Sequence, residues 1–281
     1  MIARHLAPLR EASRHFVARW RERERESAQS GRHIEAAIAL FLCGFIVFVA
    51  WFGDLRAALA MRALSDDWRW PFHRINALGE SGWIFAVSIV VLLAALLMRH
   101  RGFGRRVDAA LGVLAGRAFF VFATVAVSGL LSLAVKSVFG RARPRLLDMV
   151  GPFHFDAFSV KSAMLSFPSG HAVTAFAAAS AIAFLAPRLG WIAFALAVLV
   201  GFARVVTGAH YPSDVIGGMA LGLATTIFLR RAFAARSIVF RSTPDGIVLR
   251  GAGLVAPTLR ALLRRRGAPV SARKSITRSP P

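Results

Sequence analysis

The fold is decided by residues 167–214, which read FPSGHAVTAFAAASAIAFLAPRLGWIAFALAVLVGFARVVTGAHYPSD. This stretch holds two apolar runs, 172–187 and 189–203, with a polar cluster before the first run and another after the second. Each run is shorter than the ~20 residues that a helix needs to cross the hydrocarbon core of a membrane. We therefore expect both helices to extend into the polar clusters, and the clusters to lie at one membrane face.

The rest of the chain shows the same separation of apolar runs from charged residues. Hydrophobic residues make up 56% of the 281 residues, and 36 Lys and Arg stand against 14 Asp and Glu. A charged chain this apolar is typical of membrane proteins, which excludes a disordered chain and a nucleic-acid-binding protein as first interpretations. Four further apolar runs complete the pattern: 34–52, 82–98, 118–135 and 215–229. The sequence predicts an all-α, polytopic membrane protein built as a bundle of six transmembrane helices.

The distribution of basic residues predicts how these helices are oriented. With the N-terminus inside the cell, the inner segments carry 25 Lys and Arg and the outer segments carry nine. Because cytoplasmic loops hold an excess of Lys and Arg, this count favours an even number of crossings with both termini in the cytoplasm. We divide the chain into a basic amphipathic cytoplasmic arm (1–33), a six-helix membrane domain (34–230) and a basic cytoplasmic tail (231–281). A solvated tail is an equally good interpretation of the arm.

Three shorter features accompany the helices. The segment 53–81 is too long to lack structure in a compact protein, and its LRAALAMRAL stretch followed by two tryptophans predicts a short interfacial helix. The PDG sequence at 244–246, flanked by apolar residues, predicts a small hairpin. Gly218 and Gly222 stand four residues apart, a spacing that allows close contact between helices in lipid.

Three polar clusters carry the chemistry, and all of them fall on the outer face in this topology: KSVFGRARP (136–144), FPSGHA (167–172) and ARVVTGAHYPSD (203–214). In the second cluster, Ser169 is placed to cap the apolar helix that follows, and Gly170 leaves the backbone uncovered. The free N–H groups and the helix dipole favour an anion there. Taken alone, a plain helix cap with His171 facing the lipid headgroups is the simpler interpretation.

The third and first clusters add a histidine–carboxylate pair and several cations. His210 and Asp214 stand four residues apart, so one helical turn places both on the same face. There Asp214 can orient the imidazole, leaving the other ring nitrogen free to attack, although a structural surface pair is the alternative. Arg204 ends the preceding run, only a short link before His210. Lys136 and Arg143 lie on the face where basic residues are disfavoured, so a bound anion explains them better than anchoring to headgroups.

Three cations together with backbone N–H groups suit the oxygens of a transferring phosphoryl group. With these residues the sequence resembles the type 2 phosphatidic acid phosphatase superfamily, whose signature is K-x6-R-P, then P-S-G-H, then S-R-x5-H-x3-D. All three parts occur in order between Lys136 and Asp214, and the six-helix layout extends the resemblance to about residue 230. One position departs from the signature, because Ala203 stands where the family usually has Ser. This replacement removes a hydroxyl but no essential chemical role.

The resemblance implies a role for each matching residue. His210 would be the nucleophile that forms a phosphohistidine, Asp214 its orienting partner, and His171 first the acid for the leaving oxygen and then the base for water. The residues that would bind the phosphoryl oxygens are Lys136, Arg143, Ser169, Gly170 and Arg204. Because the fixed cations take the place of magnesium, we expect no cofactor and no metal. The outer link 145–167 is interpreted as a lid or as plain surface.

The expected activity is that of a metal-independent membrane lipid phosphatase with its site at the outer, periplasmic face of the cell inner membrane. Its partners would be the bilayer and a lipid phosphate, with four candidates left open: phosphatidic acid, phosphatidylglycerol phosphate, undecaprenyl diphosphate and lipid A phosphates. The other interpretations are a lipid phosphotransferase using the same intermediate, a non-enzymatic anion transporter and a lipid-binding scaffold. Polar residues clustered at one face, without an internal repeat, argue against the transporter. The apolar runs argue against the soluble vanadium-dependent haloperoxidases that share the family fold.

Overall fold

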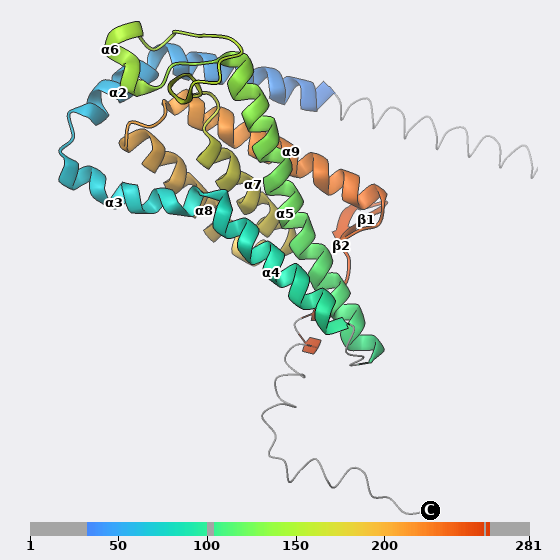
Figure 1. Cartoon of the computed structure of the whole chain (residues 1–281). Helices are drawn as coiled ribbons and strands as arrows, with labels where there is room; N and C mark the ends of the chain where they lie inside the picture. Colours follow the sequence, from blue (N-terminus) through green and yellow to red (C-terminus); the bar gives the residue numbers. More distant parts are fainter. Residues whose placement is uncertain (1–32, 100–103, 256, 259–281) are drawn as a thin grey trace, which may run out of the picture. The chain divides into compact units, whose positions relative to one another are not determined.

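The computed structural model describes residues 33–99, 104–255 and 257–258 (Figure 1). These residues divide into two units, one covering the chain up to Val49 and the other from Ala50 onward. The first unit is described from residue 33, where an apolar helix begins that runs over His33–Phe52. Phe41 and Phe45 stack on its surface with ring centroids 6.2 Å apart. The first predicted apolar run, 34–52, is therefore helical.

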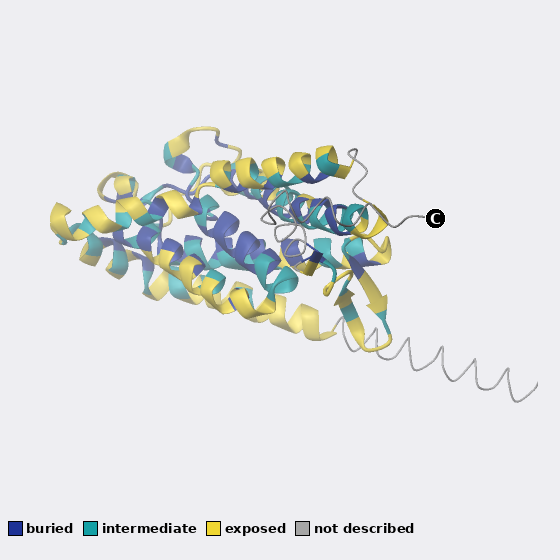
Figure 2. Ribbon diagram, turned by 90° about the horizontal axis from the view of Figure 1, so that it is seen from below, coloured by how far each residue is buried: buried dark blue, intermediate teal, exposed yellow. Residues whose placement is uncertain are grey.

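The second unit is a helical bundle that ends in a two-stranded hairpin. Its elements are α2 (Asp54–Arg62), α3 (Asp66–Asn76), η1 (Ala77–Gly79), α4 (Ser81–Arg99), α5 (Arg105–Phe139), η2 (Pro144–Leu146), α6 (Leu147–Val150), η3 (Ser162–Met164), α7 (Gly170–Leu185), α8 (Pro187–Val206), α9 (Pro212–Ala235), β1 (Phe240–Thr243) and β2 (Gly246–Leu249). α7 packs against α5, α8 and α9. Figure 2 shows the buried residues gathered in the middle of this bundle.

Small residues allow α7 to occupy the interior. Every residue from Ala172 to Ala181 is buried, and the alanines among them let neighbouring helices come close. On α9, a Cβ added to Gly218 would lie 2.7 Å from the backbone oxygen of Ser169, and one added to Gly222 would lie 2.7 Å from that of Val173. The close helix contact predicted for these two glycines is confirmed.

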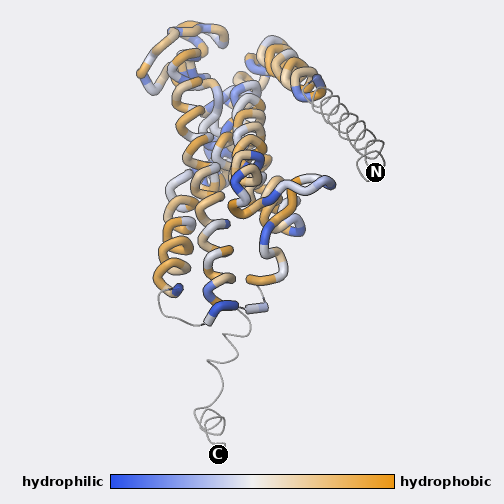
Figure 3. The backbone as a smooth tube through the Cα atoms, turned by 90° about the vertical axis from the view of Figure 1, so that its right-hand side faces the viewer, coloured by the Kyte–Doolittle hydropathy of each residue, from blue (hydrophilic) through white to orange (hydrophobic). Residues whose placement is uncertain are grey.

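The described residues include five helical stretches that are long and apolar enough to cross a membrane: His33–Phe52, Asp66–Arg99, Arg105–Phe139, Pro187–Val206 and Pro212–Ala235. The second of these combines α3, η1 and α4. Figure 3 shows the residues of the helices coloured largely in orange, which marks hydrophobic residues. α7 is apolar as well, but its 16 residues are fewer than a crossing needs. A helical, multi-pass membrane protein is therefore confirmed, whereas the count of six spans stays a prediction.

Most helices begin and end close to the expected positions, but α5 begins at Arg105, 13 residues before the predicted run 118–135. α7 begins at Gly170, α8 continues through Arg204, and α9 begins at Pro212, so all three extend into the polar clusters as predicted. In the segment 53–81, α2 covers the predicted interfacial helix, and α3 adds a second helix that carries both tryptophans.

The hairpin around residues 244–246 is confirmed, with Phe240 paired to Leu249 and Thr243 to Gly246. It buries Phe240 against Phe120 of α5, with ring centroids 4.9 Å apart. This small sheet departs from the helical structure of the other described elements, and the sequence predicted it as a hairpin. The predicted basic arm and the basic end of the tail lie outside the described residues.

Candidate active site

The residues that the sequence predicts for the site lie at helix ends or in the loop directly after a helix. They come from the ends of α5 and α8, the starts of α7 and α9, and two loops: Lys136, Arg143, Ser169, Gly170, His171, Arg204, His210 and Asp214. α7 meets α5 where a Cβ on Gly170 would lie 3.7 Å from Cε of Lys136. α7 meets α9 where the N–H of Ser169 donates to the backbone oxygen of Asp214, at 2.9 Å. The structure therefore brings these residues together at one end of the bundle.

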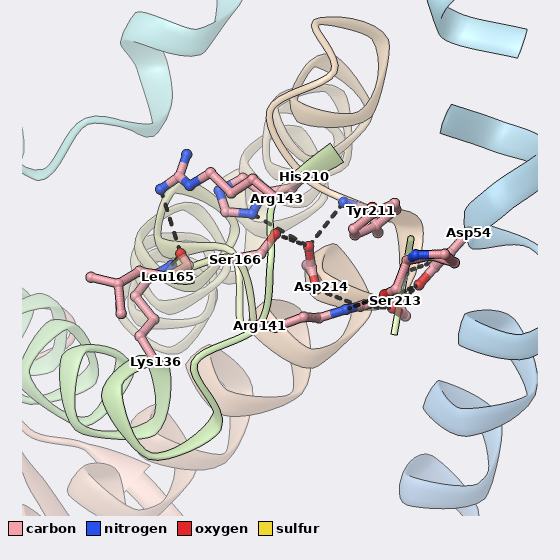
Figure 4. Close-up of polar contacts among 11 residues, drawn as sticks. Asp54, Lys136, Arg141, Arg143, Leu165, Ser166, His210, Tyr211, Ser213 and Asp214 are labelled. Atoms are coloured by element: carbon pink, nitrogen blue, oxygen red, sulfur yellow. Dashed lines mark hydrogen bonds and ion pairs between the residues drawn. The ribbon is translucent and has the colours of Figure 1, made fainter. Parts of the chain in front are cut away.

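Three cations lie near His171, at the start of α7. Lys136, Arg143 and Arg204 all lie within electrostatic range of His171. Nζ of Lys136 and Nη2 of Arg143 donate to the backbone oxygen of Leu165, at 2.9 and 3.4 Å (Figure 4). Among the described residues, the buried polar atoms of this region that have no hydrogen-bond partner include Nε of Arg143, Nε of Arg204 and Oγ of Ser169. Because buried polar groups are nearly always hydrogen-bonded, these atoms suit an acceptor-rich anion such as a phosphoryl group.

His210 and Asp214 face each other as predicted. Nδ1 of His210 lies 3.6 Å from Oδ2 of Asp214, slightly beyond a hydrogen bond, and both side chains are buried. The same Oδ2 accepts hydrogen bonds from Oγ of Ser166 at 2.6 Å and from the N–H of Tyr211 at 2.9 Å. Because Nδ1 faces the carboxylate, Nε2 is the ring nitrogen left for chemistry.

The pKa of His210 is lowered to about 3, chiefly by burial, with a smaller contribution from the positive charges of Lys136 and Arg143 and against the opposing effect of Asp214. At neutral pH the imidazole is therefore uncharged and its lone pair is available. A nucleophile needs this state.

Two charged residues of the site, Arg141 and Asp54, were not predicted from the sequence. Arg141 places Nη1 2.7 Å from Oδ1 of Asp214 and Nη2 2.7 Å from Oδ2 of Asp54 (Figure 4). Asp54 begins α2, 87 residues earlier in the chain than Arg141. Arg141 lies inside the first polar cluster and could have been singled out there. Asp54 could not, because no local pattern connects it to the site.

An apolar cleft of about 560 Å³ opens beside the site. It is bordered by η1, α4, α5 and α7, and Lys136, Gly170 and His171 line it together with apolar residues of α4 and α5: Phe85, Val125, Ala126, Leu130 and Leu133. The cleft therefore joins a cationic end to hydrocarbon side chains.

Among the described residues, no group of three or more His, Cys, Asp or Glu side chains is placed so that it could hold a metal ion. The predicted independence from metal ions stays a prediction.

Comparison with known proteins places this architecture in a family. The model of the PAP2 superfamily matches residues 117–238. A lipid A 1-phosphatase from Rhizobium johnstonii is 37% identical over 172 residues, which are 61% of this chain and 70% of that protein. The chain belongs to the PAP2 superfamily. The predicted resemblance is thus confirmed.

Other PAP2 members support this assignment. Phosphatidylglycerophosphatase B from Bacillus subtilis is 33% identical over 178 residues, which are 59% of this chain and 75% of that protein. The crystal structure of a transmembrane PAP2-type phosphatidylglycerolphosphate phosphatase from Bacillus subtilis covers 72% of this chain and 96% of its own, at a TM-score of 0.50 and 22% identity. The likeness to that structure shows that the fold is shared.

Proposed function

We propose that this protein is a multi-pass membrane phosphatase that hydrolyses the phosphoryl group of a lipid through a phosphohistidine on His210. The observation that carries the proposal is the set of buried, unpartnered donors of Arg143, Arg204 and Ser169 beside two histidines. The apolar cleft next to them supports a lipid as the bearer of the phosphate. The relatives named above support the same class of reaction.

The proposed reaction has two steps, transfer of the phosphoryl group to His210 and its release to water. Nε2 of His210 attacks phosphorus, the bond to the lipid oxygen breaks, and His171 in its protonated form gives its proton to that oxygen. The negative charge of the bound phosphoryl group favours this protonated form against the three cations beside His171. In the second step His171 removes a proton from water, the water oxygen attacks phosphorus, and the bond to nitrogen breaks. The cations hold the phosphoryl oxygens in both steps, where negative charge develops.

Two further parts of the proposal concern substrate and location. Relatives named lipid A 1-phosphatases favour a phosphorylated glycolipid such as a lipid A phosphate over the other three candidates. The excess of basic residues in the inner segments supports an inner-membrane protein with cytoplasmic termini and a site facing the periplasm.

The test is phosphate release from a panel of lipid phosphates by the purified full chain, with His210→Ala as the variant. We expect release by the wild type that persists in EDTA, and a loss of about 1,000-fold or more in His210→Ala because the nucleophile is gone. His73→Ala, an exposed histidine of α3, is the matched control and should keep wild-type activity.

Other outcomes would decide against parts of the proposal. A phosphorylated lipid acceptor in place of free phosphate would identify a phosphotransferase. Activity that vanished in EDTA and returned with a divalent ion would contradict the metal-free site. An unchanged rate in His210→Ala would refute the phosphohistidine.

A further inference from the structure

We propose that Arg141 and Asp54 are positioning residues for this reaction, which together hold the Asp214 carboxylate facing His210. The inference rests on the proposed phosphatase function. It names two residues that the signature does not specify: Arg141, at an unspecified position of the first motif, and Asp54, on a helix that precedes every motif.

The contacts form a closed, buried network. Nη1 of Arg141 donates to Oδ1 of Asp214 and to Oγ of Ser213, each at 2.7 Å. Nη2 donates to Oδ2 of Asp54 at 2.7 Å. The side chains of Arg141, Asp54 and Asp214 are 3%, 0% and 0% exposed, so solvent does not screen these charges. Figure 4 shows Arg141 between the two carboxylates.

Arg141 differs from the arginines assigned to phosphate binding. Its Nε and Nη2 also donate to the backbone oxygen of Pro152, at 3.3 and 3.0 Å, so all three of its nitrogens have partners within the protein. Arg143 and Arg204 each keep a buried Nε without a partner. Arg141 is therefore committed to the carboxylates, whereas the other two can receive a ligand.

Asp54 also holds the start of α9, because it binds Ser213 next to Asp214. Its Oδ1 accepts the N–H of Ser213 at 3.0 Å, and its Oδ2 accepts the Ser213 hydroxyl. Ser213 directly precedes Asp214 in the first turn of α9. Asp54 thus holds the backbone that carries Asp214 as well as the guanidinium that binds it.

The two oxygens of Asp214 are consequently assigned to different partners. Oδ1 is taken by Arg141, which leaves Oδ2 for Ser166, the N–H of Tyr211 and the imidazole of His210. Without Arg141, Oδ1 loses its partner and the carboxylate is held through Oδ2 alone, so the orientation of the nucleophile is weakened. The donors proposed for phosphate are separate, so the loss should appear in kcat and not in KM.

The experiment compares Arg141→Gln, Arg141→Lys and Asp54→Asn in the full chain, with a lipid phosphate that the wild type hydrolyses. We expect kcat to fall about 100-fold or more in Arg141→Gln and about 10-fold in Asp54→Asn, with KM and the inhibition constant of vanadate within about threefold of wild type. Arg141→Lys should recover about 10-fold of the loss because it restores one charge. Arg69→Gln, which breaks the pair between the partly buried Arg69 and the exposed Asp66 of α3, is the matched control.

Each outcome has a defined meaning. If folded variants keep kcat within twofold of wild type, or raise KM as much as they lower kcat, the positioning role is overturned. Should Arg141→Gln not fold, the nearly isosteric Asp54→Asn decides the question, with its thermal unfolding measured alongside. A wild-type protein that releases no phosphate from any lipid would overturn the proposed function itself, and the inference with it.

Discussion

At the scale of single residues, His210 is a buried imidazole that must stay neutral. It is 3% exposed, and burial lowers its pKa to about 3. As the pH falls, the unfolded chain binds this proton near pH 6.5, well before the folded protein does. The contribution to stability is therefore complete above about pH 6.5 and is lost progressively as the pH falls toward 3.

We therefore predict that acid destabilises the protein through His210. Between pH 6.5 and pH 4 the free energy of unfolding should fall by up to about 1.4 kcal/mol per pH unit from this residue. The measurement is the apparent unfolding temperature of the detergent-solubilised protein against pH, for the wild type and for His210→Asn. The variant lacks the titrating group and should show a shallower slope, so identical slopes would contradict the prediction.

At the scale of elements, the packing of α9 on α7 positions the catalytic turn. The first turn of α9 carries Asp214, and further along Gly222 lies against the backbone of α7. α2 is tied to the loop after α5 in a similar way, because Arg62 donates to Asp148 at 2.7 Å and to the backbone oxygen of Pro144. A shift of either helix would move charged groups of the site.

We predict that Gly222→Ala lowers both stability and activity. The added Cβ would lie 2.7 Å from the Val173 oxygen and 3.0 Å from the N of Ala177, so α9 must move away from α7. Overpacking of this kind costs about 1–3 kcal/mol. Thermal unfolding and phosphate release measure the two effects. Gly44→Ala is the control, since nothing lies within 4 Å of its added Cβ, and an equal effect of both substitutions would contradict the packing argument.

At the scale of the whole molecule, the site and the hairpin lie at different levels along α5. Phe120 of α5 packs against Phe240 of the hairpin, whereas Lys136 lies about 24 Å further along the helix. This separation is close to the thickness of the hydrocarbon core. The proposed topology therefore places the loop 145–167 and the hairpin on opposite sides of the membrane.

We predict that cysteine labelling in spheroplasts will place the loop 145–167 and the hairpin on opposite sides of the membrane. In a Cys43→Ser background, Lys161→Cys should react with a membrane-impermeant maleimide in intact spheroplasts, and Asp245→Cys only after the membrane is disrupted. Both positions are exposed, so burial does not explain a difference. The reverse pattern would contradict a periplasmic site, and equal labelling of both would contradict the separation across the membrane.

Much of this protein follows from its sequence by itself. Apolar runs predict helices because membrane helices need continuous hydrocarbon surface, and α4 and α8 match their runs closely. The three motifs predict which residues meet, since each lies at a helix end and consecutive helices bring those ends to one face. Membership of the PAP2 superfamily and the lipid phosphatase class agree with the relatives, while the phosphohistidine and the residue roles stay predictions.

Only the tertiary structure decided how the charges pair. Asp54 and Arg141 are 87 positions apart, and their 2.7 Å contact depends on how α2 and the loop after α5 pack on the start of α9. The cleft between α4 and α5 and the burial of α7 likewise arise from helices meeting in space. Sequence spacing reveals partners one helical turn apart, but a buried ion pair between distant segments is selected by packing and by the need to match every buried charge.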